Sequence, residues 1–472
     1  MNGASVTDLA LLIPELILVG AALVLILGAR RIRNAQLVVA GTFFASLAAA
    51  VSSGWLLSDG PKIGFGGMIT VDGYSQFFKI LIASALALAA LLSTRMDAER
   101  VRPAEYHVLL LLASTGMMLA VSSLDLLPLY LGLELMTLCS YILVGITVER
   151  PASNEAAIKY FLLSSFASAI LLYGIALTYG VTGSTDFAAI ASALSENELG
   201  DSKLLMAAIG LLVAGLAFKI SAAPFHAWVP DAYQGASAPV AAFLAATSKV
   251  AGLAVLGRVC LVPFASQARV LSMAMAGLAA LSIIVGSIIA LSQTDMKRLL
   301  AYSSIAHAGY ALLGFVSISP EGASATMTYT FFYVFMTLGA FGVVIALGRR
   351  GETLDDYQGL AAQRPKTAAL MLLFLLSLTG IPPTAGFVAK FVVIRSVVSA
   401  DYVALAVVAV VCSVITAFVY LRVAVFMYMK EPQGPEPSPY PVAVSVALVV
   451  AALVTVIGGI FPGTLMSWAV AP

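Results

Sequence analysis

Six of the ionisable residues within long apolar stretches of the chain are candidates for chemistry, because a charge there is costly. They are Glu134, Lys159, Lys219, Lys249, His307 and Lys390. A charge at the centre of a bilayer costs roughly 2.5–3.5 kcal/mol on insertion scales, so such residues are functional candidates. An unpaired lysine in a medium of low dielectric constant either loses its proton or is surrounded by water. Both outcomes suit a group that takes up and releases protons.

Lys249 is the clearest case, because its side chain cannot reach the membrane surface. It is eleven residues into the apolar stretch 238–260, about 17 Å along a hydrocarbon core of about 30 Å. Glu134 and His307 are comparably deep. The alternative is a set of static buried ion pairs, but three deep lysines face one deep glutamate. Pairing therefore cannot neutralise all the lysines, and proton transfer is favoured.

The other charged residues of the apolar stretches have plainer explanations. Lys159 is nearer a surface, so a solvated lysine is an equal alternative to a functional one. Taken alone, His307 would be interpreted as a hydrogen-bonded core histidine. The other deep charged residues of the chain favour a functional role for it. Lys79, Arg258 and Arg395 are close enough to helix ends to extend their charges into water. We interpret Arg422 as structural.

Two of the apolar stretches contain helix breaks, and each carries one of the lysines. In residues 215–230, Pro224 and Pro230 each remove a backbone donor, and Lys219 precedes Pro224 by five residues. In residues 378–391, Gly380, Pro382, Pro383 and Gly386 precede Lys390. Freed carbonyls at membrane depth need protein or water as partners. The alternative is that the two breaks are unrelated proline kinks with no shared role.

The composition restricts the chain to a membrane protein. Hydrophobic residues make up 61% of its 472 residues and charged residues only 10%, against roughly 25% charged in soluble domains. The 25 basic residues are balanced by 24 acidic ones, which excludes the basic surface of a nucleic-acid binder. The three cysteines are far apart in apolar runs, and no metal-ligand spacing, GxGxxG or P-loop motif is present.

We predict an all-α polytopic fold with about fourteen membrane spans, the seventh and twelfth of them broken. No basic residue precedes the first apolar run, so we expect that run to span the membrane and not to be a cleaved signal. The expected spans are 8–29, 35–57, 74–94, 106–122, 124–148, 155–180, 204–235, 238–260, 268–293, 297–317, 325–347, 366–398, 402–428 and 441–466.

The basic residues of the loops support this map and give it an orientation. With the first residue outside, fourteen basic residues fall in inner loops and three in outer loops, as the positive-inside rule requires. The inner residues are Arg30, Arg31, Arg33, Arg95, Arg100, Arg102, Arg150, Lys297, Arg298, Arg349, Arg350, Arg364, Lys366 and Lys430; the outer ones are Lys62, Lys203 and Arg269.

The two broken spans are five apart, which predicts an internal repeat. A unit of five helices is odd, so its second copy is inverted in the membrane, as in many transporters. Spans 4–8 and 9–13 would form the two copies. We expect an N-terminal three-helix segment at 1–105, the first repeat at 106–260, the second at 268–428 and a C-terminal helix at 429–472.

Taken together, these residues resemble the antiporter-like membrane subunits of respiratory complex I, the proton-pumping NADH:quinone oxidoreductase. The resemblance covers nearly the whole chain. It is carried by residues 129–135 (LYLGLEL), 155–161 (EAAIKYF), 215–258, 296–310 (MKRLLAYSSIAHAGY) and 378–391. The chain ends soon after its last span, like the shorter family members, and Lys390 stands where subunit M usually has a glutamate.

The resemblance implies a proton path through the chain. Glu134 is expected to pair with Lys219 and tune its proton affinity, and Lys249 to act as the central relay of the first repeat. His307 is expected to pass protons along a hydrated axis toward Lys390, the outer terminal residue of the second half-channel. Lys159 is expected to connect the charges laterally, and bound waters can bridge the gaps.

The resemblance also implies partners and a location. The chain is expected to bind no cofactor or metal itself, whereas NADH, FMN, iron–sulfur clusters and quinone belong to partner subunits. The expected partners are antiporter-like subunit M, small subunits such as K and J, and phospholipids, with no nucleic acid. The chain is then a non-redox subunit of a translocase in the bacterial inner membrane, with both termini on the periplasmic side.

Two other functions stay open at the level of sequence. A stand-alone or Mrp-type sodium/proton antiporter could use the same lysines, although a sodium site usually needs more carboxylates than the single deep one here. A purely structural membrane scaffold predicts that Lys219→Ala leaves pumping unchanged. Association with an NADH-active assembly distinguishes the first alternative, and that substitution distinguishes the second.

Overall fold

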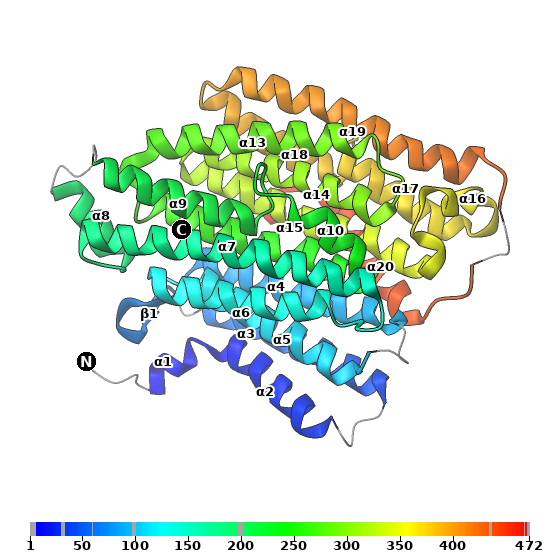
Figure 1. Cartoon of the computed structure of the whole chain (residues 1–472), viewed down its shortest axis with the longest axis horizontal. Helices are drawn as coiled ribbons and strands as arrows, with labels where there is room; N and C mark the ends of the chain where they lie inside the picture. The colour runs from blue at the N-terminus through cyan, green and yellow to red at the C-terminus, as the bar shows by residue number, and fades with distance from the viewer. Residues whose placement is uncertain are drawn as a thin grey trace.

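The chain folds into a bundle of long helices with one short β-hairpin among the described residues. The computed structural model describes residues 6–29, 34–58, 60–96, 101–196, 202–433, 437–466 and 468–469. Most helices run along the long axis of the molecule (Figure 1). Helices satisfy their own backbone hydrogen bonds, which is what a bilayer demands of a spanning segment. The all-α polytopic fold expected from the sequence is confirmed.

Eleven helices of the described part are long and apolar enough to cross a membrane. The three remaining expected spans are the first and the two with predicted breaks. The first corresponds to a helix of 16 residues, α2 (Ile13–Gly28). The seventh and the twelfth are each divided into two shorter helices, so both breaks are confirmed. The total of fourteen crossings stays a prediction.

The helices of the N-terminal segment pack on one another, and a short hairpin connects two of them. Asp72 caps α4, because its carboxylate accepts a hydrogen bond from the Ser75 amide at 2.7 Å while the Ser75 hydroxyl bonds the Asp72 amide. Arg30, Arg31, Arg33 and Arg100 lie outside the described residues. The elements are α1 (Val6–Ala10), α2, α3 (Ala35–Ser58), β1 (Lys62–Gly64), the 3₁₀ turn Phe65–Gly67, β2 (Ile69–Val71), α4 (Gly73–Leu92) and the 3₁₀ turn Ser93–Arg95.

The first expected repeat contains the first broken span, formed by α9 and α10. A single π-helical turn, Leu244–Ser248, joins α11 to α12 directly before Lys249. Such turns interrupt the regular hydrogen-bond ladder and are frequent at functional sites. The elements are α5 (Pro103–Val121), α6 (Leu126–Val144), α7 (Pro151–Thr182), α8 (Phe187–Glu196), α9 (Lys203–Lys219), α10 (Trp228–Gly235), α11 (Ala238–Phe243) and α12 (Lys249–Leu261).

The second expected repeat contains the second broken span, formed by α17 and α18. Its helices α14 and α15 are almost completely buried in the centre of the bundle. The elements are the 3₁₀ turn Ala265–Gln267, α13 (Ala268–Ala290), α14 (Met296–Leu313), the 3₁₀ turn Gly314–Ser317, α15 (Pro320–Leu347), the 3₁₀ turns Gly348–Gly351 and Leu354–Tyr357, α16 (Leu360–Gln363), α17 (Pro365–Thr379), α18 (Ala385–Ser399) and α19 (Val403–Met429).

Two matching loop contacts support the inverted repeat. Asp125 caps α6, and its neighbours exchange two backbone hydrogen bonds with residues 185–187. Asp295 caps α14, and its neighbours exchange the same pair of bonds with residues 352–354. The first contact lies beside α8 and the second leads to α16, and these two helices lie at opposite ends of the bundle (Figure 1). We call these ends the α8 end and the α16 end.

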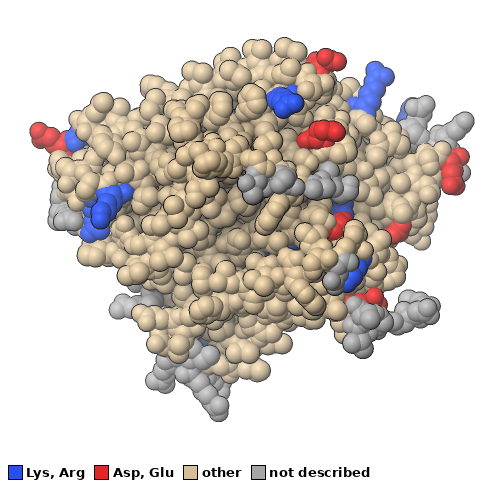
Figure 2. Space-filling view, turned by 180° about the vertical axis from the view of Figure 1, so that it is seen from behind, with Lys and Arg blue, Asp and Glu red and all other residues tan. Residues whose placement is uncertain are grey.

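The outer surface of the bundle suits a lipid environment. Helix α20 (Val442–Ile460) packs on α15, and the short helix α21 (Gly463–Met466) follows it. Large apolar side chains such as Phe44, Phe166 and Phe418 are exposed. Figure 2 shows a face that is predominantly uncharged. Apolar surface of this extent is unfavourable in water and favourable against acyl chains.

Candidate functional site

Glu134 and Lys219 form an ion pair inside the bundle, as the resemblance implied. The Lys219 ammonium lies 3.1 Å from a carboxylate oxygen of Glu134. Ser168 donates to the same oxygen at 2.5 Å, and Lys219 also donates to Thr137 at 2.8 Å and to Ser168 at 3.1 Å. The Lys219 side chain is 2% exposed and that of Glu134 is 21% exposed. The pair is therefore shielded from bulk water on the lysine side.

The chain positions Lys219 through the helix break that follows it. Lys219 is the last residue of α9, where the partial negative charge of the helix C-terminus favours a cation. The freed backbone groups of the break find protein partners: Trp228 donates to the Phe218 carbonyl, and the Ala223 amide donates to the Ser282 hydroxyl. A lysine at such a break is held in a polar pocket and not against hydrocarbon.

Lys249 is fully buried and has only weak polar contacts. Its ammonium lies 3.4 Å from the Ser221 hydroxyl and 3.3 Å from the Tyr233 hydroxyl. The same ammonium lies 5.7 Å from the centre of the Tyr233 ring. No carboxylate within the described part of the chain forms an ion pair with it. An ammonium with so few acceptors is loosely held and can give up its proton readily.

His307 sits at the centre of a group of tyrosines. Its Nδ1 lies 2.6 Å from the Tyr329 hydroxyl, and the rings of Tyr310 and Tyr333 pack against the imidazole. The Ser304 hydroxyl, one turn away on α14, is buried beside the hydroxyls of Tyr233 and Tyr333 without completing a hydrogen bond. Hydroxyl groups thus lie between Lys249 and His307.

Lys390 is held at the second helix break. Its ammonium donates to the Thr379 carbonyl at 2.8 Å and to the Ser413 hydroxyl at 2.9 Å, and it lies 4.5 Å from the centre of the Tyr310 ring. Thr379 is the last residue of α17, so its carbonyl is one that the break leaves free. The Lys390 ammonium thus takes the place of the missing backbone donor. Lys219 has the corresponding position at the first break.

The structure brings Glu134 and Lys219 into contact but leaves the other three groups apart. Among the described residues, no hydrogen bond or ion pair joins Lys249, His307 and Lys390 directly. The gaps are lined by tyrosines: Tyr233 contacts Lys249, and Tyr310 contacts both the imidazole of His307 and the ammonium of Lys390. Periodicity did not reveal these tyrosines, because a buried tyrosine is usually a core residue.

Lys159 lies at the α16 end, apart from the buried groups. Its side chain is 48% exposed and forms ion pairs with Glu155 at 2.7 Å and with Asp231 at 3.2 Å. Asp231 also pairs with Arg298 at 2.8 Å. A cavity of about 270 Å³ opens beside this cluster. Lys159 was predicted from its place in an apolar stretch, whereas Asp231 was not, because its position in the seventh span gave no sign of its two partners.

Extension of Lys79 into water, expected from the sequence, is wrong. Lys79 is fully buried on α4, and its ammonium lies 2.7 Å from the carboxylate of Glu15 on α2, whose side chain is 6% exposed. No other hydrogen-bond partner reaches either group in the part of the chain that the structure describes. Glu15 was not predicted, because the depth of a residue along one helix does not show which side chain faces it from another helix.

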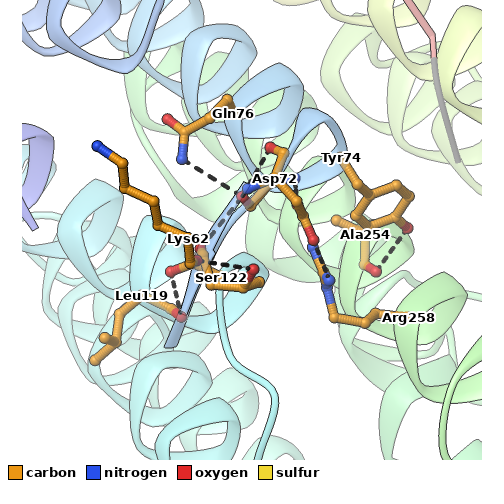
Figure 3. A network of polar contacts seen from close by, with 10 residues as sticks. Lys62, Asp72, Tyr74, Gln76, Leu119, Ser122, Ala254 and Arg258 are labelled. Atoms are coloured by element: carbon orange, nitrogen blue, oxygen red, sulfur yellow. Dashed lines mark hydrogen bonds and ion pairs between the residues drawn. The ribbon is translucent and has the colours of Figure 1, made fainter. Parts of the chain in front are cut away.

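Extension of Arg258 into water, also expected from the sequence, is wrong, because its side chain is 3% exposed and is paired with a carboxylate at the helix end. Its guanidinium makes two hydrogen bonds to Asp72, at 2.7 and 2.9 Å, and stacks over Tyr74, whose hydroxyl donates to the Ala254 carbonyl (Figure 3). Burial raises the pKa of Asp72, but the hydrogen bonds and charge of Arg258 outweigh it and hold that pKa below its usual value. This contact ties α12, the helix of Lys249, to α4.

The remaining membrane charges agree with the sequence interpretation. Arg395 is exposed. Arg422 donates to the carbonyls of Leu291 and Gln293 at the end of α13, which fits a structural role. The free cysteines Cys139, Cys260 and Cys412 are buried. No group of three or more potential metal ligands occurs within the described ranges.

The comparisons with known proteins agree with this architecture. Residues 123–416 match the family model described as NADH:quinone oxidoreductase/Mrp antiporter, transmembrane. The chain is 44% identical to the NADH-quinone oxidoreductase subunit N of Desulfovibrio desulfuricans, over 98% of this chain and 96% of that one. It is 43% identical to a subunit N of Rhizobium meliloti, over 98% of this chain and 97% of the other.

Solved structures lead to the same family. A chain of respiratory complex I from Thermus thermophilus is 35% identical, with a TM-score of 0.84 over 97% of this chain and all of that one. A chain of the Mrp complex from a Dietzia species shares the fold, with a TM-score of 0.88 over 98% and 96% of the two chains at 23% identity. The protein therefore belongs to the NADH:quinone oxidoreductase/Mrp antiporter family of transmembrane subunits, among its subunit N members.

Proposed function

We propose that the chain moves protons across a bacterial inner membrane as a non-redox subunit of NADH:quinone oxidoreductase. Quinone reduction in partner subunits, which hold NADH, FMN, iron–sulfur clusters and quinone, drives the movement. The partners are other membrane subunits, with M, K and J as the expected neighbours, together with phospholipids. The asymmetry of basic loop residues supports termini on the periplasmic side.

The observation that carries the proposal is a contrast among the three buried lysines of the expected proton path, one of which is paired with a carboxylate and two of which are not. Lys219 is held by Glu134, whereas Lys249 and Lys390 have hydroxyl and carbonyl partners and no carboxylate in the described part of the chain. A carboxylate within about 4–6 Å favours the charged ammonium by about 1–3 pKa units. Making or loosening the Glu134 contact would therefore switch Lys219 between holding and releasing a proton.

The remaining steps are proposed in the order in which their groups lie along the bundle. A proton released by Lys219 passes to Lys249, since Lys219 ends the helix before the first break and Ser221 of that break contacts Lys249. From Lys249 the tyrosine hydroxyls and Ser304 lead to His307, and Tyr310 leads on to Lys390. Bound waters complete this path where side chains do not touch, because proton transfer needs groups within hydrogen-bonding reach. Lys159 serves as the lateral connection at the α16 end.

The proposal is tested in bacterial membranes whose native copy of the subunit is replaced by the tagged chain. A native gel stained for NADH dehydrogenase activity first establishes whether the chain assembles into a large NADH-active complex. Lys219→Ala and Lys249→Ala are then expected to lower proton pumping while assembly is retained. Lys430→Ala, a change of an exposed lysine, is the matched control.

Two results would contradict the proposal. A chain that migrates alone or only with small membrane partners is not coupled to quinone reduction, and sodium/proton exchange becomes the leading function. Unchanged pumping in both lysine variants of an assembled complex supports a structural scaffold.

A further inference from the structure

The half-helix α10 brings Tyr233 to Lys249, so the position of α10 decides how Lys249 is held. Helix α10 has only eight residues and is flanked by the break on one side and by an extended residue, Ala236, on the other. So short a helix has little stability of its own. Its position must therefore come from the elements packed against it.

The first turn of α14 makes four hydrogen bonds to α10 and to the residue that follows it. Arg298 bonds the Asp231 carboxylate at 2.8 Å and the side-chain carbonyl of Gln234 at 3.0 Å. Lys297 donates to the backbone carbonyls of Gln234 at 2.6 Å and Ala236 at 2.8 Å. These two carbonyls are free at the C-terminal end of α10, where a cation is favoured. Lys297 is 3% exposed, so its contacts are shielded from water.

Asp231 extends this contact to a third helix. Its second carboxylate oxygen accepts from Lys159 on α7, while the first accepts from Arg298 on α14. Helices α7 and α10 belong to the first repeat and α14 to the second. Asp231 therefore joins the two repeats at the α16 end. The pair with Lys159 is half exposed and weak, whereas the pair with Arg298 is supported by Gln234 and is the stronger of the two.

The same helices carry the groups of the proton path. Tyr233, the neighbour of Gln234, contacts Lys249, and α14 carries His307 nine residues after Arg298, about 13 Å along the axis. A shift of α10 against α14 thus changes the separation between the first and second halves of the path. A displacement of about 1 Å is enough to impair a positioned group severely.

We propose that Asp231 and Arg298 form a latch between the repeats that positions Tyr233 against Lys249. In this role Asp231 is a positioning residue, and no proton passes through it. The inference rests on the proposed function, because it assigns the latch to the same Lys249. The latch affects how many protons are moved for each electron, and it does not affect electron transfer itself.

The test uses the assembled complex in sealed membranes and compares the ratio of protons pumped to electrons transferred. Asp231→Asn preserves the shape of the side chain and removes its charge. We expect normal assembly and electron transfer and a proton-to-electron ratio at least twofold lower. Asp231→Glu, which restores the charge, is expected to recover part of the ratio. Glu155→Gln, which removes an exposed charge of the same cluster and leaves the Arg298 contact intact, is expected to retain the ratio.

The controls separate the latch from the proposed function. If Lys249→Ala lowers pumping and Asp231→Asn does not, the latch is wrong and the proton path stands. If Lys249→Ala has no effect, the proton path itself is wrong. Should Asp231→Asn fail to assemble, Arg298→Gln is expected to assemble and show the same lower ratio; failure of both to assemble means a purely structural contact and overturns the proposal.

Discussion

The carboxylate of Glu134 and the ammonium of Lys219 lie 3.1 Å apart, and Ser168 bonds both of them. Ser168 donates to Glu134 and accepts from Lys219, so its hydroxyl stabilises the charged form of the pair. Because Glu134 is on α6, Ser168 on α7 and Lys219 on α9, small movements among three helices change all three contacts at once. This makes the pair sensitive to the state of neighbouring elements.

Ser168→Ala is expected to slow proton pumping without preventing assembly. Hydrogen bonds to charged groups contribute about 1.5–3 kcal/mol, so their loss weakens the pair by roughly tenfold or more. Proton pumping in sealed membranes measures the effect. Thr178→Ala is the matched control, because Thr178 is buried on the same helix and bonds only its own backbone at Gly174. Equal pumping rates in the two variants would show that Ser168 does not tune the pair.

Tyr233→Phe is expected to impair the first half of the path. The change keeps the ring and removes one of the two hydroxyls that contact the Lys249 ammonium. We expect roughly tenfold slower pumping at normal assembly, since a positioned proton-transfer partner contributes about 10²–10⁴-fold and Ser221 remains. Tyr106→Phe serves as control, because the Tyr106 hydroxyl is buried and has no hydrogen-bond partner among the described residues. A normal rate for Tyr233→Phe would remove this tyrosine from the path.

Glu15→Gln is expected to destabilise the N-terminal segment. The substitution leaves the Lys79 charge buried without its partner, and breaking a buried pair in this way costs about 3–5 kcal/mol. Thermal unfolding of the purified complex in mild detergent, followed through this subunit, measures the loss. The double variant Glu15→Leu with Lys79→Met is expected to recover most of the stability. A double variant as unstable as the single one would show that the contact between Glu15 and Lys79 stabilises the fold by more than mutual neutralisation of the two charges.

Acid should weaken the contact between Asp72 and Arg258. A carboxyl group whose pKa is lower in the folded than in the unfolded state stabilises the fold above its unfolded value, near 3.9. That stabilisation is lost as the pH falls below this value and through the folded pKa. Asp72→Asn is expected to lower stability at neutral pH by about 1.5–3 kcal/mol, because Arg258 loses a charged hydrogen-bond partner.

The pH dependence checks the same contact in a second way. Unfolding temperatures are compared between pH 3 and pH 7 for the natural chain and for Asp72→Asn. The variant is expected to lose less stability on acidification, because it lacks the titrating carboxyl. Parallel curves for the two proteins would mean that Asp72 does not contribute to the acid sensitivity.

The sequence by itself determined the class of the protein, its two helix breaks and the depth of its charges. Composition requires a membrane environment, and a proline within a helix removes a backbone donor whatever packs around it, so these predictions needed no tertiary information. The same holds for Lys219 and Lys390, because their positions beside the breaks are fixed along the chain. The family resemblance supplied the partner of Lys219, which spacing alone left open.

Tertiary structure decided which charges meet. The position of Lys79 in its span suggested that its charge extends into water, but packing of α2 on the N-terminal bundle places Glu15 against it. In the same way, Asp231 gains Arg298 only when the second repeat folds against the first, and Tyr233 faces Lys249 only because α10 turns it there. Depth along a helix follows from counting residues, whereas the neighbour on the facing helix depends on how the helices are rotated and packed.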